Sequence, residues 1–297
     1  MHEAPVLVDD GGAGLASAAA RYALFGDPVE HSLSPRIHAL FAAQTGIAMQ
    51  YSAISASPET FAAQLAQFQQ QGGRGGNVTV PLKTLAAGLC RSLAPAAQRC
   101  GVVNTLIALP EGGFHGDNTD GTGLLADITR RHQLDLRGRR TLLLGAGGAI
   151  AGIVPALLDA GVGEIVIASR RAEPAEQLAA RIGLPRRIHT AYLAALDEAG
   201  RFDLVINGTS AGHHGQSLAL PGRLAAPRAI VYDLNYGRSA IDFLAWGRAA
   251  GAHDVLDGLG MLVDQAAAAF ALWHGIEPDA DAVHAQLAGS GHHAHTD

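Results

Sequence analysis

The chain has 297 residues, a length that predicts two domains. Its formal net charge of -6 and its few aromatic residues provide neither a basic footprint nor stacking platforms, so we expect no nucleic-acid partner. No apolar run is long enough to span a bilayer, and residues 1–19 do not resemble a signal peptide, so we expect no membrane partner. Cys90 and Cys100 form no CxxC pair, which favours reduced thiols in the cytoplasm.

The first half of the chain is typical of a small α/β domain. An initial strand over 21–25 is followed by a turn at 26–28, and Ser34-Pro35 opens a helix, since serine can cap a helix and proline suits its first turn. Glycine-rich residues 72–76 lead into a later strand. The remaining strands are expected at 49–55, 77–80, 105–109 and 114–117, and the helices around 61–68, 82–89 and 95–100.

The second half alternates regularly between strand and helix. A helix over 119–131 leads to a continuous apolar strand at 140–144, as expected of a strand buried on both faces. The alternation predicts a doubly wound parallel sheet, and two final helices are free to return to the first domain. The elements after 144 are expected at 165–168, 174–181, 204–207, 230–233, 241–250, 260–273 and 279–287.

A glycine turn follows the strand at 140–144. It consists of Gly145, Ala146, Gly147, Gly148 and Ala149. Glycines at this point let the backbone approach a pyrophosphate, which the free N–H groups of the next helix can bind. The third glycine of a GxGxxG motif would fall at 150, where the chain has isoleucine. A lone GxG is often only a tight turn, but the flanking strands and helix favour a dinucleotide site.

The end of the next strand selects the dinucleotide. NAD enzymes place an acidic residue there to hold the ribose hydroxyls, whereas this chain has Ser169-Arg170-Arg171. Two guanidinium groups suit a 2′-phosphate, although a solvated arginine pair is the simple alternative. The sequence therefore favours NADP over NAD.

Polar residues of the first half supply candidates for chemistry. Ser32 and Ser34 place two hydroxyls that could hold a carboxylate, although Ser34 could equally be an N-cap. Lys83 begins a helix, where the dipole suits a proton-transfer group, but a surface lysine is the alternative. Asn104 precedes a strand. Asp120 could decorate a helix N-terminus or pair with Lys83.

Eight segments together resemble the shikimate dehydrogenase family, in that family's order and over nearly the whole chain from Tyr22 to Leu287. They are 25–35, 77–83, 103–105, 116–123, 145–149, 207–212, 232–236 and 258–265. The resemblance implies that Lys83 and Asp120 are the catalytic pair. The residues that it implies for the substrate, its ring hydroxyls or its carboxylate are Ser32, Ser34, Asn77, Thr79, Asn104, Tyr236 and Gln265.

The resemblance also implies a cofactor cleft beyond the glycine turn and the arginine pair. Its further residues are Thr209, Ser210, Leu234, Gly258 and Met261. Two departures stand out. The family often has Asn-Arg-Thr/Ser where this chain has Ser169-Arg170-Arg171, so the grip on the 2′-phosphate is built differently. The segment 213–216 has no assigned role, and its two histidines lack a third ligand nearby, so we expect no metal.

The implied fold places a substrate-binding catalytic domain at 20–119 and a Rossmann-like NADP-binding domain at 120–257. C-terminal helices at 258–288 would pack on the first domain, and disordered ends would occupy 1–19 and 289–297. The implied activity is the reversible NADPH-dependent reduction of 3-dehydroshikimate to shikimate, in the cytoplasm, for aromatic amino acid biosynthesis. A homodimer stays open.

Three alternatives stay open too. One is a paralogue that prefers quinate or NAD, and another is a dehydrogenase of a different cyclic acid. The third is a catalytically silent, ligand-sensing relative, which the intact Lys83 and Asp120 disfavour.

Overall fold

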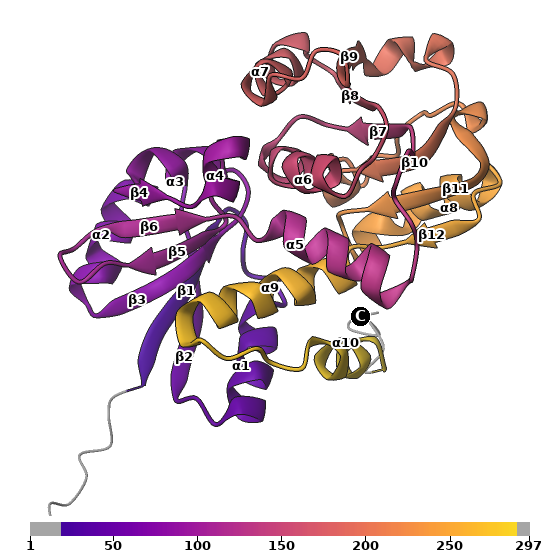
Figure 1. The fold of residues 1–297 in the computed structure, drawn as a ribbon. Helices are drawn as coiled ribbons and strands as arrows, with labels where there is room; N and C mark the ends of the chain where they lie inside the picture. Colours follow the sequence, from indigo (N-terminus) through magenta and orange to yellow (C-terminus); the bar gives the residue numbers. More distant parts are fainter. Residues whose placement is uncertain (1–18, 290–297) are drawn as a thin grey trace, which may run out of the picture.

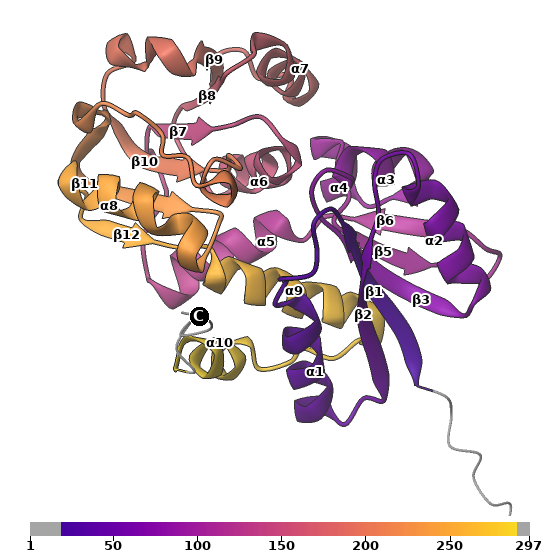
Figure 2. The same cartoon turned by 180° about the vertical axis from the view of Figure 1, so that it is seen from behind.

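The computed structural model describes residues 19–289, which fold around two six-stranded sheets (Figure 1). Each sheet forms the centre of its own lobe, and the second view shows the same two lobes from behind (Figure 2). Most of the predicted extension at 1–19 and of the predicted tail at 289–297 lies outside the described residues. The two sheets come from separate halves of the chain, as the sequence predicts.

The first sheet is mixed and has the spatial order β2-β1-β3-β5-β6-β4. β5 is antiparallel to both of its neighbours, and the remaining pairs are parallel. The aromatic side chains of α2 pack with β1 on one face, whereas α1 packs with the C-terminal helices on the other. The elements of this lobe are β1 Ala20–Gly26, α1 Ser34–Thr45, β2 Met49–Ser55, α2 Phe61–Gln70, β3 Gly73–Val78, α3 Lys83–Leu89, β4 Ser92–Leu93, α4 Pro95–Cys100, β5 Thr105–Ala108 and β6 Phe114–Asp117.

The second sheet is wholly parallel and has the order β12-β11-β10-β7-β8-β9. From β9 to β12 this is the 3-2-1-4-5-6 order of dinucleotide-binding folds, with the chain reversal between β7 and β10. The prediction of a doubly wound parallel sheet is confirmed. Its elements are β7 Thr141–Leu144, α6 Gly148–Asp159, β8 Ile165–Ser169, α7 Ala172–Ile182, β9 Ile188–Tyr192, β10 Phe202–Asn207, β11 Ala225–Asp233, α8 Ile241–Ala249 and β12 Asp254–Leu256.

The continuous apolar strand β7 explains how this sheet is packed. Successive side chains of a strand point to opposite faces, so its leucines serve two cores. Leu143 joins the core beneath α6 and α7, whereas Leu142 and Leu144 join the core that includes Phe243 of α8. Because helices cover both faces, the strand needs no polar residues along its length.

Two helical segments that follow the first sheet and two that follow the second connect the lobes. α5 (Asp120–Leu125) continues as a π-helix over Ala126–Arg131, and α9 (Leu259–His274) and α10 (Ala280–Gly289) follow the second sheet. α9 runs beside α5 from the second lobe to the first, and it packs against α1 (Figure 1, Figure 2). The return of the C-terminal helices to the first domain is therefore confirmed.

Several local predictions need correction. Residues 73–76 are part of strand β3, because Gly75 and Gly76 lie so close to neighbouring strands that side chains there would meet backbone oxygens. The helix expected over 119–131 changes to π geometry after Leu125. The short strands β4, β9 and β12 were not predicted, since they are edge strands whose residues show no clear alternation of buried and exposed positions.

Helix α1 begins differently from the prediction. Leu33, not Ser34, is its N-cap residue, and no side chain caps it in the usual way. Ser32 instead accepts a hydrogen bond from the backbone N–H of Ser34 at 3.2 Å. Within residues 19–289, no helix is both long enough and apolar enough to cross a membrane.

Candidate active site

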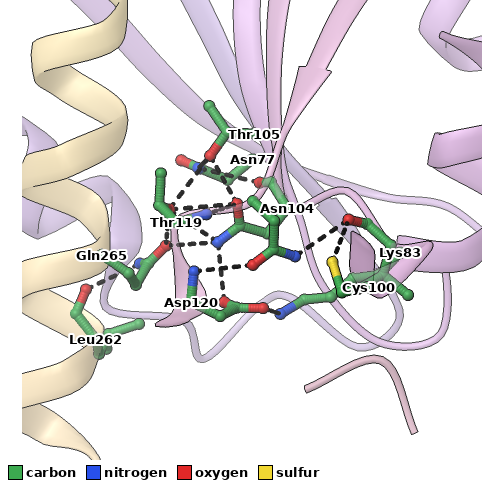
Figure 3. Close-up of polar contacts among 11 residues, drawn as sticks. Asn77, Lys83, Cys100, Asn104, Thr105, Thr119, Asp120, Leu262 and Gln265 are labelled. Atoms are coloured by element: carbon green, nitrogen blue, oxygen red, sulfur yellow. Dashed lines mark hydrogen bonds and ion pairs between the residues drawn. The ribbon is translucent and has the colours of Figure 1, made fainter. Parts of the chain in front are cut away.

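A lysine and an aspartate that are distant in the sequence meet where the lobes join (Figure 3). Lys83 is the first residue of α3 and Asp120 is the first residue of α5. Lys83 Nζ lies 2.6 Å from Asp120 Oδ2, and both side chains are buried. Within the described part of the chain, this carboxylate is the one hydrogen-bond partner of the ammonium group. Two of its three N–H donors are therefore available to a ligand.

The Asp120 carboxylate is fixed by neighbouring amides. Asn104 Nδ2 donates to Asp120 Oδ1 at 2.9 Å, while Oδ2 faces the lysine. Asn118 Oδ1 accepts the backbone N–H of Asp120 at 3.1 Å, and its amide nitrogen donates to the carbonyl of Val102. One carboxylate oxygen thus faces the protein and the other faces the ammonium, so the pair has a defined orientation.

Asn104 is the centre of this polar network (Figure 3). Its Oδ1 accepts from Thr119 N and Thr105 Oγ1, each at 2.8 Å. Its amide nitrogen lies 2.9 Å from Thr119 Oγ1 and 3.2 Å from Oε1 of Gln265, which α9 brings in from the C-terminal segment. These partners engage both ends of the amide, so Asn104 is held firmly where it donates to the Asp120 carboxylate. Its predicted contact with a ring hydroxyl stays a prediction.

Asn77 lies beside this network and depends on a residue that the sequence did not single out. Tyr51 Oη donates to Asn77 Oδ1 at 2.7 Å, and Asn77 Nδ2 donates to the Asn104 carbonyl at 3.2 Å. The His38 ring stacks on the Tyr51 ring with a centroid distance of 4.2 Å. Burial raises the pKa of Tyr51 and lowers that of His38 to about 3, so both stay neutral near neutral pH. The one signal for Tyr51 in the sequence is an aromatic hydroxyl within a strand.

The glycine turn lies against the Lys83–Asp120 pair. Gly145 has a φ of +102°, which favours glycine, and Gly147 has no heavy atom within 4 Å of the position where a Cβ would stand. In α6, a Cβ on Gly148 would lie 3.0 Å from the Lys83 Cβ, and a Cβ on Gly152 would lie 2.6 Å from Asp120 Oδ2. The pair and the helix N-terminus therefore border the same space.

The predicted carboxylate-binding residues come together across the two lobes. Ser32 Oγ donates to Ser34 Oγ at 3.2 Å. Tyr236, from the second lobe, hydrogen-bonds the backbone of Leu33 between them, and its burial raises its pKa, which keeps it a hydroxyl. Thr79 is half-buried in the turn between β3 and α3.

The residues predicted for the 2′-phosphate lie at the carboxyl end of β8. Ser169 Oγ donates to the carbonyl of Arg171 and so shapes this turn. Arg170 and Arg171 are exposed, and neither forms an ion pair with another described residue. Ala146 and Ala149 of the glycine turn are half-buried. The cationic pair is therefore accessible to an anion.

The other predicted cofactor residues follow β10 and β11. Thr209 is half-buried and Ser210 is exposed after β10, while Leu234 follows β11 directly. Gly258 lies so close to Leu234 that a side chain there would meet its carbonyl oxygen. Met261 is buried in α9 and belongs to the core beneath the second sheet.

The strand order, the glycine turn and the buried ammonium–carboxylate pair beside it define a two-domain protein of the dinucleotide-binding class. Family models agree. Residues 24–106 match the shikimate dehydrogenase substrate binding domain, 127–216 match shikimate / quinate 5-dehydrogenase, and 258–288 match the shikimate 5′-dehydrogenase C-terminal domain.

Individual relatives extend the agreement. The shikimate dehydrogenase (NADP(+)) of Xanthomonas campestris pv. campestris is 53% identical over 90% of this chain and 95% of its own length. The shikimate 5-dehydrogenase of Thermus thermophilus, solved with NADP(H) and shikimate, is 32% identical, with a TM-score of 0.77 over 92% of this chain and 100% of that one. A 5-ketofructose reductase of Gluconobacter is 27% identical, with a TM-score of 0.75 over 92% and 99%. This chain belongs to the shikimate dehydrogenase family.

Proposed function

We propose that this chain catalyses the reversible NADPH-dependent reduction of 3-dehydroshikimate to shikimate. The observation that carries the proposal is the buried Lys83–Asp120 pair, 2.6 Å apart and set against the helix that follows the glycine turn. The names of the relatives support it, since the Xanthomonas protein is a shikimate dehydrogenase that uses NADP(+) and the Thermus protein was solved with NADP(H) and shikimate.

The second lobe fits the dinucleotide. The open space at Gly147 admits a pyrophosphate to the N-terminus of α6, where unpaired N–H groups and the positive end of the dipole favour an anion. Arg170 and Arg171 are exposed cations at the position that selects between NAD and NADP. When bound, NADPH supplies the hydride for carbonyl reduction.

The chain's own residues handle the proton and the developing charge. Negative charge grows on the carbonyl oxygen as the carbonyl is reduced, and the free donors of Lys83 can stabilise that oxygen and deliver the proton. Asp120 keeps the ammonium in place and balances its charge, while Asn104 keeps Asp120 oriented. In the oxidation of shikimate, the same groups accept the proton from the alcohol.

The substrate carboxylate is assigned to the other side of the junction between the lobes. Ser32 and Ser34 offer hydroxyl groups at the start of α1, and Tyr236 reaches them from the second lobe. Hydroxyls bind a carboxylate by donating hydrogen bonds, and both lobes must be in place for all three to do so. Thr79, Asn77 and Gln265 are left to position the ring.

The test is a steady-state panel that follows the absorbance of NADPH or NADH. Shikimate and quinate are oxidised with NADP and NAD, and 5-ketofructose is reduced with NADPH and NADH. We expect the highest kcat/KM for shikimate with NADP. Higher kcat/KM for quinate or for NAD would identify the paralogue alternative, and preferred reduction of 5-ketofructose would overturn the substrate assignment. Absence of turnover with every pair would favour a silent, ligand-sensing relative.

Two finer features stay predictions. A cytoplasmic location follows from the sequence argument about Cys90 and Cys100, and cell fractionation tests it. A homodimer is tested by sedimentation of the purified chain across a range of concentrations.

A further inference from the structure

A buried carboxylate outside the catalytic pair lies beneath the predicted cofactor cleft. Asp233 ends β11 and is fully buried. Its hydrogen-bond donors are amides: Asn207 Nδ2 reaches both oxygens at 3.1 Å, and Asn235 gives its backbone N–H at 2.9 Å and its side-chain amide at 2.8 Å. Within residues 19–289 no lysine, arginine or histidine forms an ion pair with it. A buried charge without a cation is costly, so its retention calls for a purpose.

The amides around Asp233 are themselves tied to the loop after β10. Asn207 Oδ1 accepts the backbone N–H of Thr209 at 3.0 Å and its hydroxyl at 2.8 Å. Asn235 Nδ2 also donates to the Thr209 carbonyl at 3.1 Å. Both backbone polar groups of Thr209 are thus held by residues that Asp233 orients. The neighbouring carbonyl of Gly208 lies against Gly145, so the loop also borders the glycine turn.

The hydrogen bonds around Asp233 and Asn235 also reach the residues after β11. The carbonyl of Asn235 accepts the Gly258 N–H at 2.9 Å, which sets the start of α9. The next residue, Tyr236, reaches Leu33 between the two serines of the first lobe. One buried carboxylate therefore lies behind Thr209, Gly258 and Tyr236.

We infer that Asp233 is a positioning residue for the cofactor: its carboxylate locks the loops after β10 and β11 into the arrangement that receives NADPH. The inference rests on the proposed NADPH dependence. It assigns Asp233 no contact with the reacting atoms, since it acts through Asn207, Asn235 and Thr209.

The hydrogen-bond pattern requires an acceptor-only side chain at this position. In Asp233→Asn, the new NH2 group must face either the two Asn235 donors or the Asn207 amide, and each is already a donor. Flipping Asn207 gives no relief, because its NH2 would then face the Thr209 N–H. The mismatch must be relieved by movement of the loops.

A paired exchange restores the pattern. With Asn207→Asp added to Asp233→Asn, the carboxylate at 207 accepts from the amide at 233 and still accepts from Thr209, while the amide oxygen at 233 still accepts from Asn235. Net charge and shape match the natural protein. This double-mutant cycle isolates the interaction between the two positions.

The experiment measures the Kd of NADPH by calorimetry in the absence of substrate, together with Tm. We expect Asp233→Asn to raise Kd about tenfold, and the double exchange to bring it back to within about threefold of the natural protein, as for the loss of one buried hydrogen-bonded anchor. Asn235→Ala removes one amide at a half-buried position and should raise Kd about threefold, which keeps the test informative if Asp233→Asn folds poorly. The matched control is Asp127→Asn, another buried aspartate, which should lower Tm without changing Kd.

Three outcomes would overturn the inference: an unchanged Kd in Asp233→Asn, a double exchange that fails to restore binding, or an equal loss of binding in Asp127→Asn. If the unsubstituted protein binds NADPH but does not reduce 3-dehydroshikimate, the proposed function is wrong. The comparison of Kd values would still test the role of Asp233 in that case.

Discussion

Two ionic clusters built on buried aspartates lie where the lobes are connected, and they differ in how completely their charges are satisfied. In one, the Lys83 ammonium meets a single carboxylate, Asp120. In the other, Arg131 donates to Asp127 at 2.7 Å, to both oxygens of Asp264 at 2.9 and 3.0 Å, and to Asp281 at 3.0 Å. Tyr232 Oη then donates to the second oxygen of Asp127 at 2.6 Å.

The difference indicates what each cluster does. The Arg131 cluster joins the π-helix, β11, α9 and α10, and its donors are used within the protein, as expected of a structural tie. The Asp120 side of the Lys83 pair is also held, by Asn104 and Asn118, but among residues 19–289 the ammonium group donates to Asp120 alone and so retains unused donors. A buried cation that is oriented but incompletely satisfied is suited to bind an oxygen that becomes negative during a reaction.

The strongest test of the comparison replaces Lys83 by methionine, an unbranched side chain that is one atom shorter and carries no charge. We expect kcat for shikimate to fall by about 10²–10⁴, the usual contribution of a general acid or base, with a much smaller change in KM. Steady-state kinetics in both directions measure this, at temperatures below the Tm of the variant. A Lys83→Met enzyme with near-normal kcat would show that the Lys83 ammonium does not serve catalysis.

The corresponding change in the other cluster is Arg131→Met. It leaves Asp127 and Asp264 buried with fewer partners, so we expect unfolding free energy to fall by about 3–5 kcal/mol, as for other broken buried ion pairs. The kcat and KM should change by less than about threefold, because the acidic residues that Arg131 binds among the described residues, Asp127, Asp264 and Asp281, are not assigned to substrate or cofactor. Urea unfolding and kinetics on the same preparation separate the two effects. A large fall in kcat with unchanged stability would show that the clusters are not divided in this way.

Asp233 sharpens the comparison because it is a buried carboxylate with amide donors in place of a cation. Burial, with a smaller contribution from the field of Asp257, raises its pKa from 3.8 to about 6 against the lowering effect of the Asn235 and Asn207 amides. Since the folded state prefers the protonated form, this contribution to stability is fully present below about pH 4 and is lost as pH rises through 6.

The expected size follows from the two pKa values and is about 3 kcal/mol. Relative to Asp233→Asn, the natural protein should therefore gain up to that amount of unfolding free energy as pH falls from about 7 to about 4. Urea unfolding of both proteins across this pH range gives the difference between their unfolding free energies. The contributions of the other carboxylates are the same in both proteins and cancel. A difference that is independent of pH would mean that Asp233 has an ordinary pKa.

Much of the fold could be predicted from local pattern. The apolar run at 140–144 and the strand–helix alternation after it indicated the parallel sheet, because burial on both faces is visible in a sequence. The predicted start of strand β3 was too far along the chain, because its glycines carry no hydrophobic signal. Glycine is needed there because the backbones of Ala23 and Leu106 pack closely against the strand. Such contacts exist only after the chain has folded.

Some residues of the candidate site could be predicted from the sequence and others could not, for the same reason. Lys83 and Asp120 were found because charged groups in unusual local positions, and a family resemblance, mark them. Tyr51 acts through the orientation of another side chain, Asn77, and nothing in its local sequence indicates a partner so far along the chain. Positioning residues therefore need coordinates.

The smallest expected effect concerns α6, the helix that lies against the Lys83–Asp120 pair. In Gly152→Ala, the new methyl group would lie 2.6 Å from Asp120 Oδ2 and 3.0 Å from Asn118 Oδ1, so the carboxylate oxygen that faces the lysine is displaced. We expect kcat to fall about tenfold, since small displacements of a catalytic group are expensive, and stability to fall by about 1–3 kcal/mol from overpacking.

Gly88→Ala is the matched control, because Gly88 lies in α3, the helix that carries Lys83, with no heavy atom within 4 Å of the added methyl group. Alanine suits a helix interior better than glycine, so this variant should gain about 0.5–1 kcal/mol and keep its kcat. A difference between the two variants in kcat, measured at saturating substrate, ties the loss to the contact with Asp120. Equal kcat values would mean that Asp120 tolerates displacement, and its exact placement by Asn104 and Asn118 would then have no catalytic consequence.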